Sequence, residues 1–286
     1  MNQEQTWTIA NVLDWTREYF ESKSIDSPRL DAELVICHAL DLTRIDLYLD
    51  HHRPLTAKEL ARIRPLVQRR GKYEPIHYIL GHRDFWNISL NVDQRVLIPR
   101  PDTERLVEVV LENLTAETEM ILDLCTGSGA IALALAHEHS ELQITGTDIS
   151  DDAIEVAKAN ATSIGLEHVQ FLVADLFNGL EGSYDIITAN PPYISTTECS
   201  ELMPDVREYE PYLALHGGQD GLDIYRRIVE RAPDFLNHAG HLILEIGYKQ
   251  ANALKSMIEK TPRLKWINCY QDLAGRDRVV QAALSS

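Results

Sequence analysis

The 286-residue sequence has no long apolar run, few cysteines and few positive charges, and each shortage excludes a class of protein. No apolar stretch is long enough to span a bilayer, and the chain does not start with the charged-then-apolar pattern of a signal peptide. The four cysteines lie far apart and form no C-x-x-C pair. We therefore expect a protein of the reducing cytoplasm without a membrane partner.

Positive charge is scarce in most of the chain. Lys and Arg number 27 against 44 Asp and Glu, and the net charge is −17. Residues 1–85 are nearly neutral, with 12 basic and 13 acidic residues, so the rest of the chain is strongly acidic. Such an acidic body binds nucleic acid poorly, and we expect no direct nucleic-acid contact. Residues 53–72 are locally basic, which fits either a docking surface or a solvated helix face.

Apolar periodicity divides the chain into parts. Helical spacing predicts helices over 6–20, 27–40, 43–49 and 56–70, and thus a small helical-bundle domain over residues 1–84. Residues 85–92 alternate in the manner of a strand, and 96–98 add a second apolar run, so we predict a β-hairpin linker over 85–98. Residues 99–286 then form the catalytic domain.

The catalytic domain shows alternating strand and helix patterns. Strands are predicted at 120–124, 144–148, 169–175, 184–189, 241–246, 266–269 and 278–283. This alternation predicts an α/β fold with a doubly wound, mostly parallel, Rossmann-like sheet. In such folds the ligand site lies at the carboxyl ends of the strands.

The tetrapeptide Asn190-Pro191-Pro192-Tyr193 follows one of these strands directly. Two prolines cannot continue a strand, so the chain must turn out of the sheet there. The Asn190 side-chain oxygen and the Pro191 carbonyl are two acceptors that can hold both hydrogens of a planar NH2 group, on which Tyr193 can stack. The alternative is a strand-ending turn with an asparagine that caps it.

Three further features follow the earlier strands. Gly127-Ser128-Gly129 lets a ligand approach the backbone at a helix N-terminus. Asp148 ends the next strand, where an acid commonly binds ribose hydroxyls. Asp175 and Leu176 end the third strand, where a polar group could contact the edge of an adenine ring and an apolar side chain could pack on the ring. A dehydrogenase would need an acid or a base that handles the proton during hydride transfer, and Asn190 is neither. The pattern therefore favours S-adenosylmethionine as the ligand.

No metal site is expected, because the 11 histidines show no ligand spacing.

Taken together, these motifs resemble the bacterial-type release factor glutamine methyltransferases, the HemK/PrmC family, over nearly the whole chain. The matching stretches are Pro75–Gly81, Phe85–Trp86, Leu97–Glu104, Asp123–Leu133, Asn190–Ile194, Val206–Pro211, Gly217–Leu222 and Asp272–Arg278. The combination is more specific than the tetrapeptide, which several amino-methylating families share.

The resemblance implies methyl transfer from S-adenosylmethionine to the side-chain amide nitrogen, N5, of the glutamine in the Gly-Gly-Gln loop of class I peptide chain release factors. The N-terminal domain would help to grip the release factor, and a monomer is the default. The site residues carried over, together with Asp175 from the strand pattern, are catalytic Asn190, Pro191 and Tyr193, substrate-binding Asn190–Tyr193, and cofactor-binding Cys125, Thr126, Gly127, Ser128, Gly129, Asp148, Asp175, Leu176 and Asn190. Cys125 stands where the family usually has glycine.

The expected mechanism is direct in-line displacement by an amide nitrogen that is held in position, without a dedicated general base. Glu210 and Glu245 are interpreted as structural. Two alternatives remain: an adenine-N6 methyltransferase, which would have to flip its target base out of the stack, and a non-catalytic module that clamps release factors.

Overall fold

The computed structural model describes residues 6–285, which form two compact units. The first unit contains the chain up to Gly81 together with the segment Met203–Tyr209. The second contains His82–Leu202 and the chain from Glu210 onward. The division at Gly81 lies slightly before the predicted residue 84, because the strand that starts at His82 pairs within the second unit.

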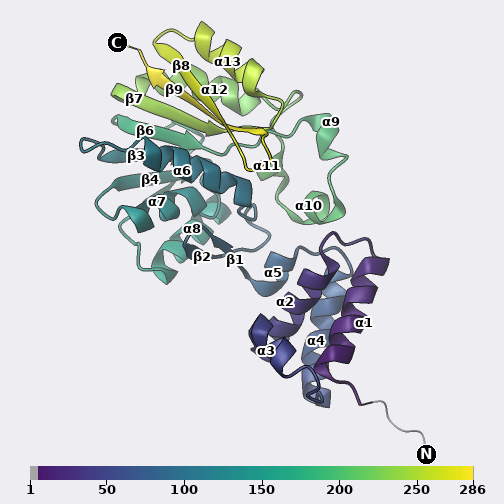
Figure 1. Cartoon of the computed structure of the whole chain (residues 1–286). Helices are drawn as coiled ribbons and strands as arrows, with labels where there is room; N and C mark the ends of the chain where they lie inside the picture. Colours follow the sequence, from purple (N-terminus) through teal and green to yellow (C-terminus); the bar gives the residue numbers. More distant parts are fainter. Residues whose placement is uncertain (1–5, 286) are drawn as a thin grey trace, which may run out of the picture. The chain divides into compact units, whose positions relative to one another are not determined.

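The first unit is helical, as its apolar spacing predicts (Figure 1). Its helices are α1 (Ile9–Ser22), α2 (Pro28–Leu40), α3 (Arg44–Leu49), α4 (Ala57–Arg70), α5 (Ile76–Leu80) and α10 (Pro204–Tyr209). Capping boxes start α1, α3 and α4, where Thr8, Thr43 and Thr56 each accept from the backbone N–H three residues on. The helices enclose a core around Phe20, Ile36 and other fully buried apolar side chains.

The hairpin differs from the predicted one. β1 (His82–Phe85) pairs antiparallel with β2 (Ile88–Asn91), and Trp86 and Asn87 form the turn between them. Trp86 adopts φ +54°, a left-handed conformation that allows the reversal at this point. The apolar run at 96–98 therefore forms no second strand, and that expectation was wrong.

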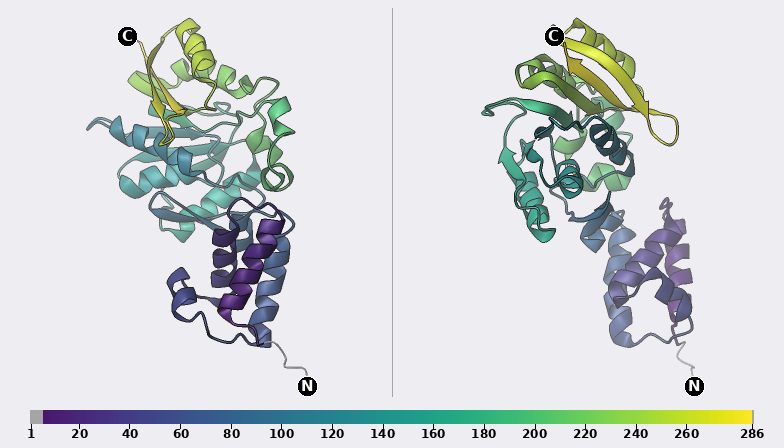
Figure 2. Two further views of the ribbon diagram at one scale, coloured as in Figure 1. Left: turned by 45° about the vertical axis from the view of Figure 1, so that its right-hand side comes forward. Right: turned by 60° about the vertical axis from the view of Figure 1, so that its left-hand side comes forward.

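The second unit is built on a seven-stranded sheet with the order β5-β4-β3-β6-β7-β9-β8. Figure 2 shows this sheet from two directions. Its strands are β3 (Met120–Leu124), β4 (Gln143–Asp148), β5 (Gln170–Val173), β6 (Tyr184–Ala189), β7 (Leu236–Glu245), β8 (Leu264–Gln271) and β9 (Asp277–Leu284). β3 to β7 run parallel, and β9 is antiparallel to both β7 and β8. The predicted doubly wound, mostly parallel sheet is confirmed.

Helices cover both faces of the sheet and give three layers. One core packs α6 (Glu104–Glu112), α7 (Ala130–Glu138) and α8 (Asp151–Ser163) on one face. The other packs α12 (Asp223–Arg231) and α13 (Ala251–Lys260) on the opposite face. Short elements complete the unit: η1 (Pro101–Thr103), η2 (Ala232–Asp234), α9 (Thr196–Cys199) and α11 (Tyr212–Leu215).

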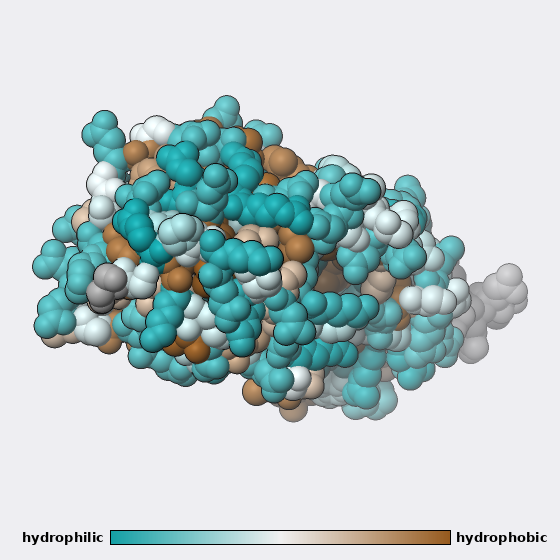
Figure 3. Space-filling view, turned by 90° about the horizontal axis from the view of Figure 1, so that it is seen from above, coloured by the Kyte–Doolittle hydropathy of each residue, from teal (hydrophilic) through white to brown (hydrophobic). Residues whose placement is uncertain are grey.

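The surface is largely hydrophilic on the face that Figure 3 shows, with apolar residues in scattered patches. Within residues 6–285, no helix combines the length and the apolar character needed to cross a membrane.

Candidate active site

The site lies where the strand order reverses, between β3 and β6. Leu124 at the end of β3 pairs with Ala189 at the end of β6. Cys125 and Asn190 therefore leave two adjacent strands at the same level, with their following loops on the same edge of the sheet. This is the topological switch point at which doubly wound folds bind their ligands.

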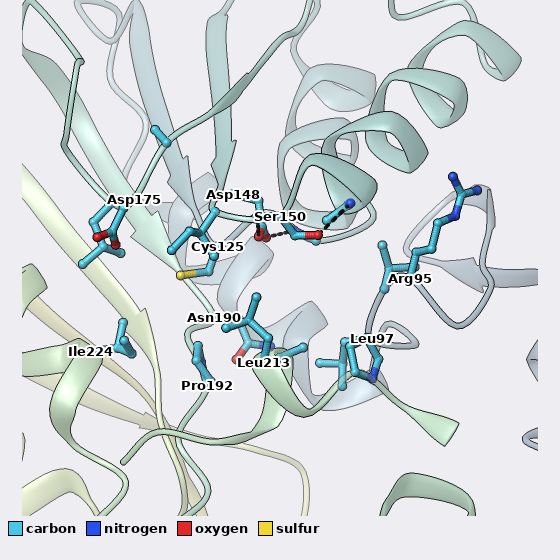
Figure 4. Close-up of a pocket in the computed structure, with 18 of the residues that line it drawn as sticks. Arg95, Leu97, Cys125, Asp148, Ser150, Asp175, Asn190, Pro192, Leu213 and Ile224 are labelled. Carbon is cyan, nitrogen blue, oxygen red and sulfur yellow. Dashed lines mark hydrogen bonds between the residues drawn. The ribbon is translucent and has the colours of Figure 1, made fainter. Parts of the chain in front are cut away.

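A cavity of about 260 Å³ opens at this point (Figure 4). Seven of the predicted site residues line it: Cys125, Gly127, Asp148, Asp175, Leu176, Asn190 and Pro192. Residues from four parallel strands and their loops thus meet around one space, as the strand pattern predicts. Thr126, Ser128, Gly129, Pro191 and Tyr193 do not line the cavity.

The loop after β3 is shaped by its backbone conformation. Cys125, Gly127 and Gly129 all adopt positive φ, of +56°, +55° and +82°. A Cβ on Gly127 would meet nothing within 4 Å, so the backbone there is open to a ligand. The side chains of Thr126 and Ser128 are buried below the loop, where the Thr126 hydroxyl donates to Asp123 at 2.6 Å.

Cys125 carries a side chain in a conformation that favours glycine. Cys125 lines the cavity, and its sulfur is turned toward the side of Asp175 rather than that of Asp148 (Figure 4). Burial raises the pKa of this thiol well above its usual value, with the negative charges of Asp148 and Asp123 adding to the effect. The thiol therefore stays protonated near neutral pH and is a poor nucleophile.

Asp148 ends β4 and holds the loop in place. Its two carboxylate oxygens accept from the backbone N–H groups of Gly127 and Ser150, each at 3.0 Å. Burial raises the pKa of this carboxyl, and these backbone N–H groups oppose the shift. Each carboxylate oxygen keeps a further lone pair for a ribose hydroxyl.

Asp175 and Leu176 lie at the far side of the cavity. Arg227 from α12 donates to Asp175 at 2.7 Å, and Leu176 adopts φ +54°. Ile149 and Ile224 line the same space and add apolar surface. The combination of a flat apolar slot and an acidic edge fits an adenine ring.

Asn190 is held by its amide nitrogen. Its Nδ2 donates to the Thr103 hydroxyl at 3.2 Å, and this bond directs Oδ1 away from Thr103. Among residues 6–285, neither Asn190 Oδ1 nor the Pro191 carbonyl accepts a hydrogen bond in the structure. Neither acceptor is therefore occupied by another group among these residues.

The turn that carries these acceptors is fixed by its surroundings. A Cβ on Gly217 would lie 2.5 Å from the Pro192 carbonyl, and one on Gly221 would lie 2.3 Å from the Tyr193 carbonyl. Gln250 donates to the Tyr193 carbonyl at 3.0 Å. The glycine-rich loop 217–221 therefore packs its backbone directly against the turn, which leaves little freedom for the turn to move.

The Tyr193 ring packs against the apolar core beside α12. Burial and the nearby Glu245 raise the pKa of its phenol to about 12. The tyrosine therefore stays neutral and, in this structure, anchors the turn.

Several cavity-lining residues were not predicted as site residues from the sequence. They come from the segment after β2 and from the neighbourhood of α11, and include Arg95, Leu97, Leu213 and Ala214. Neither segment has a strand or helix periodicity long enough to place it. Leu213 is about half exposed, at 56%, which marks it as an apolar residue at the mouth of the site.

The chemistry of the cavity fits S-adenosylmethionine. Asp148 keeps free carboxylate lone pairs, the Gly127 backbone is open, and Leu176 adds apolar surface together with Ile149 and Ile224. Among residues 6–285, no group of three or more His, Cys, Asp or Glu side chains is placed to hold a metal ion. The fold and the site together define a methyltransferase that uses S-adenosylmethionine as its methyl donor.

Comparison with known proteins gives the family. The model described as "PrmC N-terminal domain" matches residues 11–81, and that described as "Methyltransferase small domain" matches residues 103–204. The release factor glutamine methyltransferase of Geobacter sulfurreducens is 43% identical over 96% of each chain. That of Thermodesulfovibrio yellowstonii is 44% identical over 94% of this chain and 96% of its own. The chain belongs to the release factor glutamine methyltransferases.

Solved structures agree with this at the level of the fold. A methyltransferase from Pyrococcus furiosus superposes with a TM-score of 0.53 at 19% identity, covering 69% of this chain and 89% of its own.

Proposed function

We propose that the enzyme methylates N5 of the glutamine in the Gly-Gly-Gln loop of class I peptide chain release factors. The observation that carries this proposal is the Asn190 amide at the cofactor cavity, whose Oδ1, like the neighbouring Pro191 carbonyl, accepts no hydrogen bond within residues 6–285. Two acceptors fit the two hydrogens of a primary amide, whose plane they would fix. The family to which the chain belongs supports a release factor as the source of that amide.

The main task of the site is to position the substrate amide nitrogen. S-adenosylmethionine, when bound, provides a methyl group activated by its sulfonium. An amide nitrogen is a poor nucleophile because its lone pair is shared with its carbonyl. Holding the nitrogen in a near-attack geometry against the methyl group can lower the activation barrier by several kcal/mol, because the two groups no longer have to meet in the right orientation by chance. Once methylated, the nitrogen is strongly acidic and releases its proton to water, so Asn190 need not act as a base.

The test is transfer of labelled methyl from S-adenosylmethionine to purified release factor, and in a separate reaction to duplex DNA. We expect label on one glutamine, and we expect none when that glutamine is replaced by alanine. Asn190→Ala should lower turnover at least about 100-fold, the range for loss of one preorganised polar contact, with cofactor affinity nearly unchanged. Label on adenine, or full turnover in Asn190→Ala, would contradict the proposal.

We further propose that the first unit docks the release factor. An apolar groove between α1 and α4 supports this: Trp15 is 49% exposed there, stacks on Tyr19 with centroids 5.4 Å apart, and lies beside Leu60 and Arg64. Exposed aromatic and arginine side chains are typical of interface hot spots.

Only some of the basic residues in 53–72 are free to contact a release factor. Arg70 is buried and donates to Asp31 at 2.6 Å, and Arg53, Arg62 and Arg69 also have acidic partners. Arg64 is exposed at the groove, and Lys58 is exposed on the same helix outside the groove. Arg64→Glu should raise KM for whole release factor several-fold but not KM for a Gly-Gly-Gln peptide. Lys58→Glu makes the same charge change and should leave both unchanged; equal effects of the two variants would refute docking at this groove.

We also propose that the enzyme works in the cytoplasm as a monomer without direct nucleic-acid contact. Its acidic composition supports the last point.

A further inference from the structure

Two buried polar side chains lie behind Asn190, and neither lines the cavity. Thr103 ends η1 at the start of α6 and is 4% exposed. Glu245 is the last residue of β7 and is 1% exposed. The Thr103 hydroxyl accepts from Asn190 Nδ2 at 3.2 Å, and it lies close enough to the Glu245 carboxyl to lower the pKa of that carboxyl. Three separate elements thus meet in one row of polar groups.

The hydrogen bonds in this row of polar groups have a defined direction, because the Thr103 hydroxyl has only one proton to donate. When the Thr103 proton is donated to the Glu245 carboxylate, only a lone pair of the hydroxyl faces Asn190. A lone pair can receive the amide NH2 but not the amide oxygen. Asn190 must then present its oxygen to the side opposite Thr103. If the Thr103 proton instead pointed at Asn190, the amide would turn round and offer an NH2 group to the substrate.

We propose that Thr103 and Glu245 are positioning residues that orient the Asn190 amide, so that its oxygen faces the substrate nitrogen. This rests on the proposed function, because the orientation matters only if Asn190 accepts from an NH2 group. Glu245 is then more than structural: its negative charge fixes where the Thr103 proton goes. An asparagine without such a partner would be free to present either end of its amide.

The surroundings of Glu245 make this charge adjustable. The charged and titratable groups around it are Arg278 from β9, Arg100 and Asp102 from the stretch before α6, Tyr193 after β6 and Tyr225 from α12. Arg278 pairs with Asp102 and Asp272, each at 3.1 Å, so its charge is shared. Burial raises the pKa of Glu245 to about 7, while the Thr103 hydrogen bond and the positive charge of Arg278 oppose the shift. Within residues 6–285, Glu245 Oε2 has no hydrogen-bond partner.

A protonated Glu245 would release the constraint. It can itself donate to Thr103, whose own proton is then free to turn toward Asn190. The fraction of correctly oriented Asn190 should therefore fall as the pH drops through the pKa of Glu245. Turnover of the wild-type enzyme at saturating S-adenosylmethionine should fall with it. Asp148, whose pKa is also raised, acts on cofactor binding and therefore on KM rather than on kcat.

The first test compares two buried threonines on either side of the site. Thr103→Val removes the acceptor for Asn190, whereas Thr103→Ser keeps it. Thr188 lies two residues before Asn190 in β6, is fully buried, and its hydroxyl has no partner among residues 6–285. Thr188→Val is the matched control, since it makes the same change of shape without touching the Asn190 amide.

We expect Thr103→Val to lower kcat about tenfold or more, with the Kd for S-adenosylmethionine and the Tm within the range of the control. Thr103→Ser should restore kcat. In an Asn190→Ala background, Thr103→Val should cause no further loss, because the group that it orients is gone. The inference is overturned if Thr188→Val loses as much kcat, if Thr103→Val raises only the Kd for the cofactor, or if its loss multiplies with that of Asn190→Ala.

The pH profile of kcat gives a readout that a purely structural role would not move. The wild-type enzyme should lose activity between pH 8 and pH 6, and both Glu245→Gln and Thr103→Val should abolish this dependence. An unchanged profile in these variants would refute the relay. Failure of the proposed substrate is distinguishable, because it appears in the wild-type enzyme as an absence of methyl on release factor glutamine, whereas failure of this inference appears only in the variants.

Discussion

Asp123, below the cofactor loop, offers a direct test of how the raised pKa of a buried carboxyl affects the stability of the fold. It lies in β3, is fully buried, and accepts from the Thr126 hydroxyl through Oδ2 at 2.6 Å. Among the described residues Oδ1 has no hydrogen-bond partner. Burial raises the pKa of this carboxyl to about 7, and the hydrogen bond from Thr126 opposes the shift. Asp123→Asn keeps the shape and the acceptor but removes the charge.

The sign and size of the effect follow from the pKa. The folded enzyme binds the Asp123 proton more tightly than the unfolded chain, whose ordinary pKa is 3.8. Stability from this group is therefore fully present below about pH 4 and is lost as the pH rises toward 7. A shift of about 3 pKa units corresponds to at most about 4 kcal/mol. The variant cannot ionise, so it should gain stability relative to the wild-type enzyme as the pH rises.

The measurement is the free energy of unfolding of the wild-type enzyme and of Asp123→Asn, from denaturant titrations at several pH values between 5 and 8. We expect the difference between the two proteins to grow with pH in favour of the variant. Asp148 and Glu245 also have raised pKa values, but they are present in both proteins and cancel in the difference. Asp152→Asn, at the exposed start of α8, should show no such trend. A constant difference across this range would refute the reasoning.

Two further predictions concern the cofactor loop and the turn after β6. Asp148→Ala should weaken S-adenosylmethionine binding at least about tenfold in calorimetry, because hydrogen bonds to a charged acceptor contribute about 1.5–3 kcal/mol, while the exposed Asp152→Ala should leave the Kd unchanged. Gly221→Ala should lower kcat, because its Cβ would lie 2.3 Å from the Tyr193 carbonyl and displace the turn. Gly165 has nearly the same φ, +73° against +74°, and open space around it, so Gly165→Ala should affect stability alone; equal kcat for both variants would count against a fixed turn.

The sequence predicted the main features of the site because they depend on parallel strands. Each strand of such a sheet delivers its following residues to the same edge, so Asp148 and Asn190 had to come close once their strands were recognised. Pro191 and Pro192 marked the end of β6 without ambiguity, since proline cannot continue a central strand. These inferences needed only local patterns and one rule of topology.

The parts that the sequence did not predict depend on packing between distant segments. Arg95 and Leu213 reach the cavity from segments without periodicity, and the hairpin turns at Trp86 because of a left-handed conformation that this residue type seldom adopts. The link between Asn190 and Thr103 joins residues 87 positions apart in the chain. No spacing rule connects such residues, and only the folded arrangement shows that they meet.

The structure explains why so much of the second unit converges on one asparagine. In the mechanism that we propose, the site orients a weak nucleophile and uses no charged base, so small errors of angle would lower its rate. The loop around Gly221 and the side chain of Gln250 fix the backbone of the turn from outside. Thr103, according to our inference, fixes the one remaining freedom, the rotation of the Asn190 amide. Substitutions far from the cavity but within these supports should therefore lower kcat while leaving cofactor affinity intact, which separates positioning from binding.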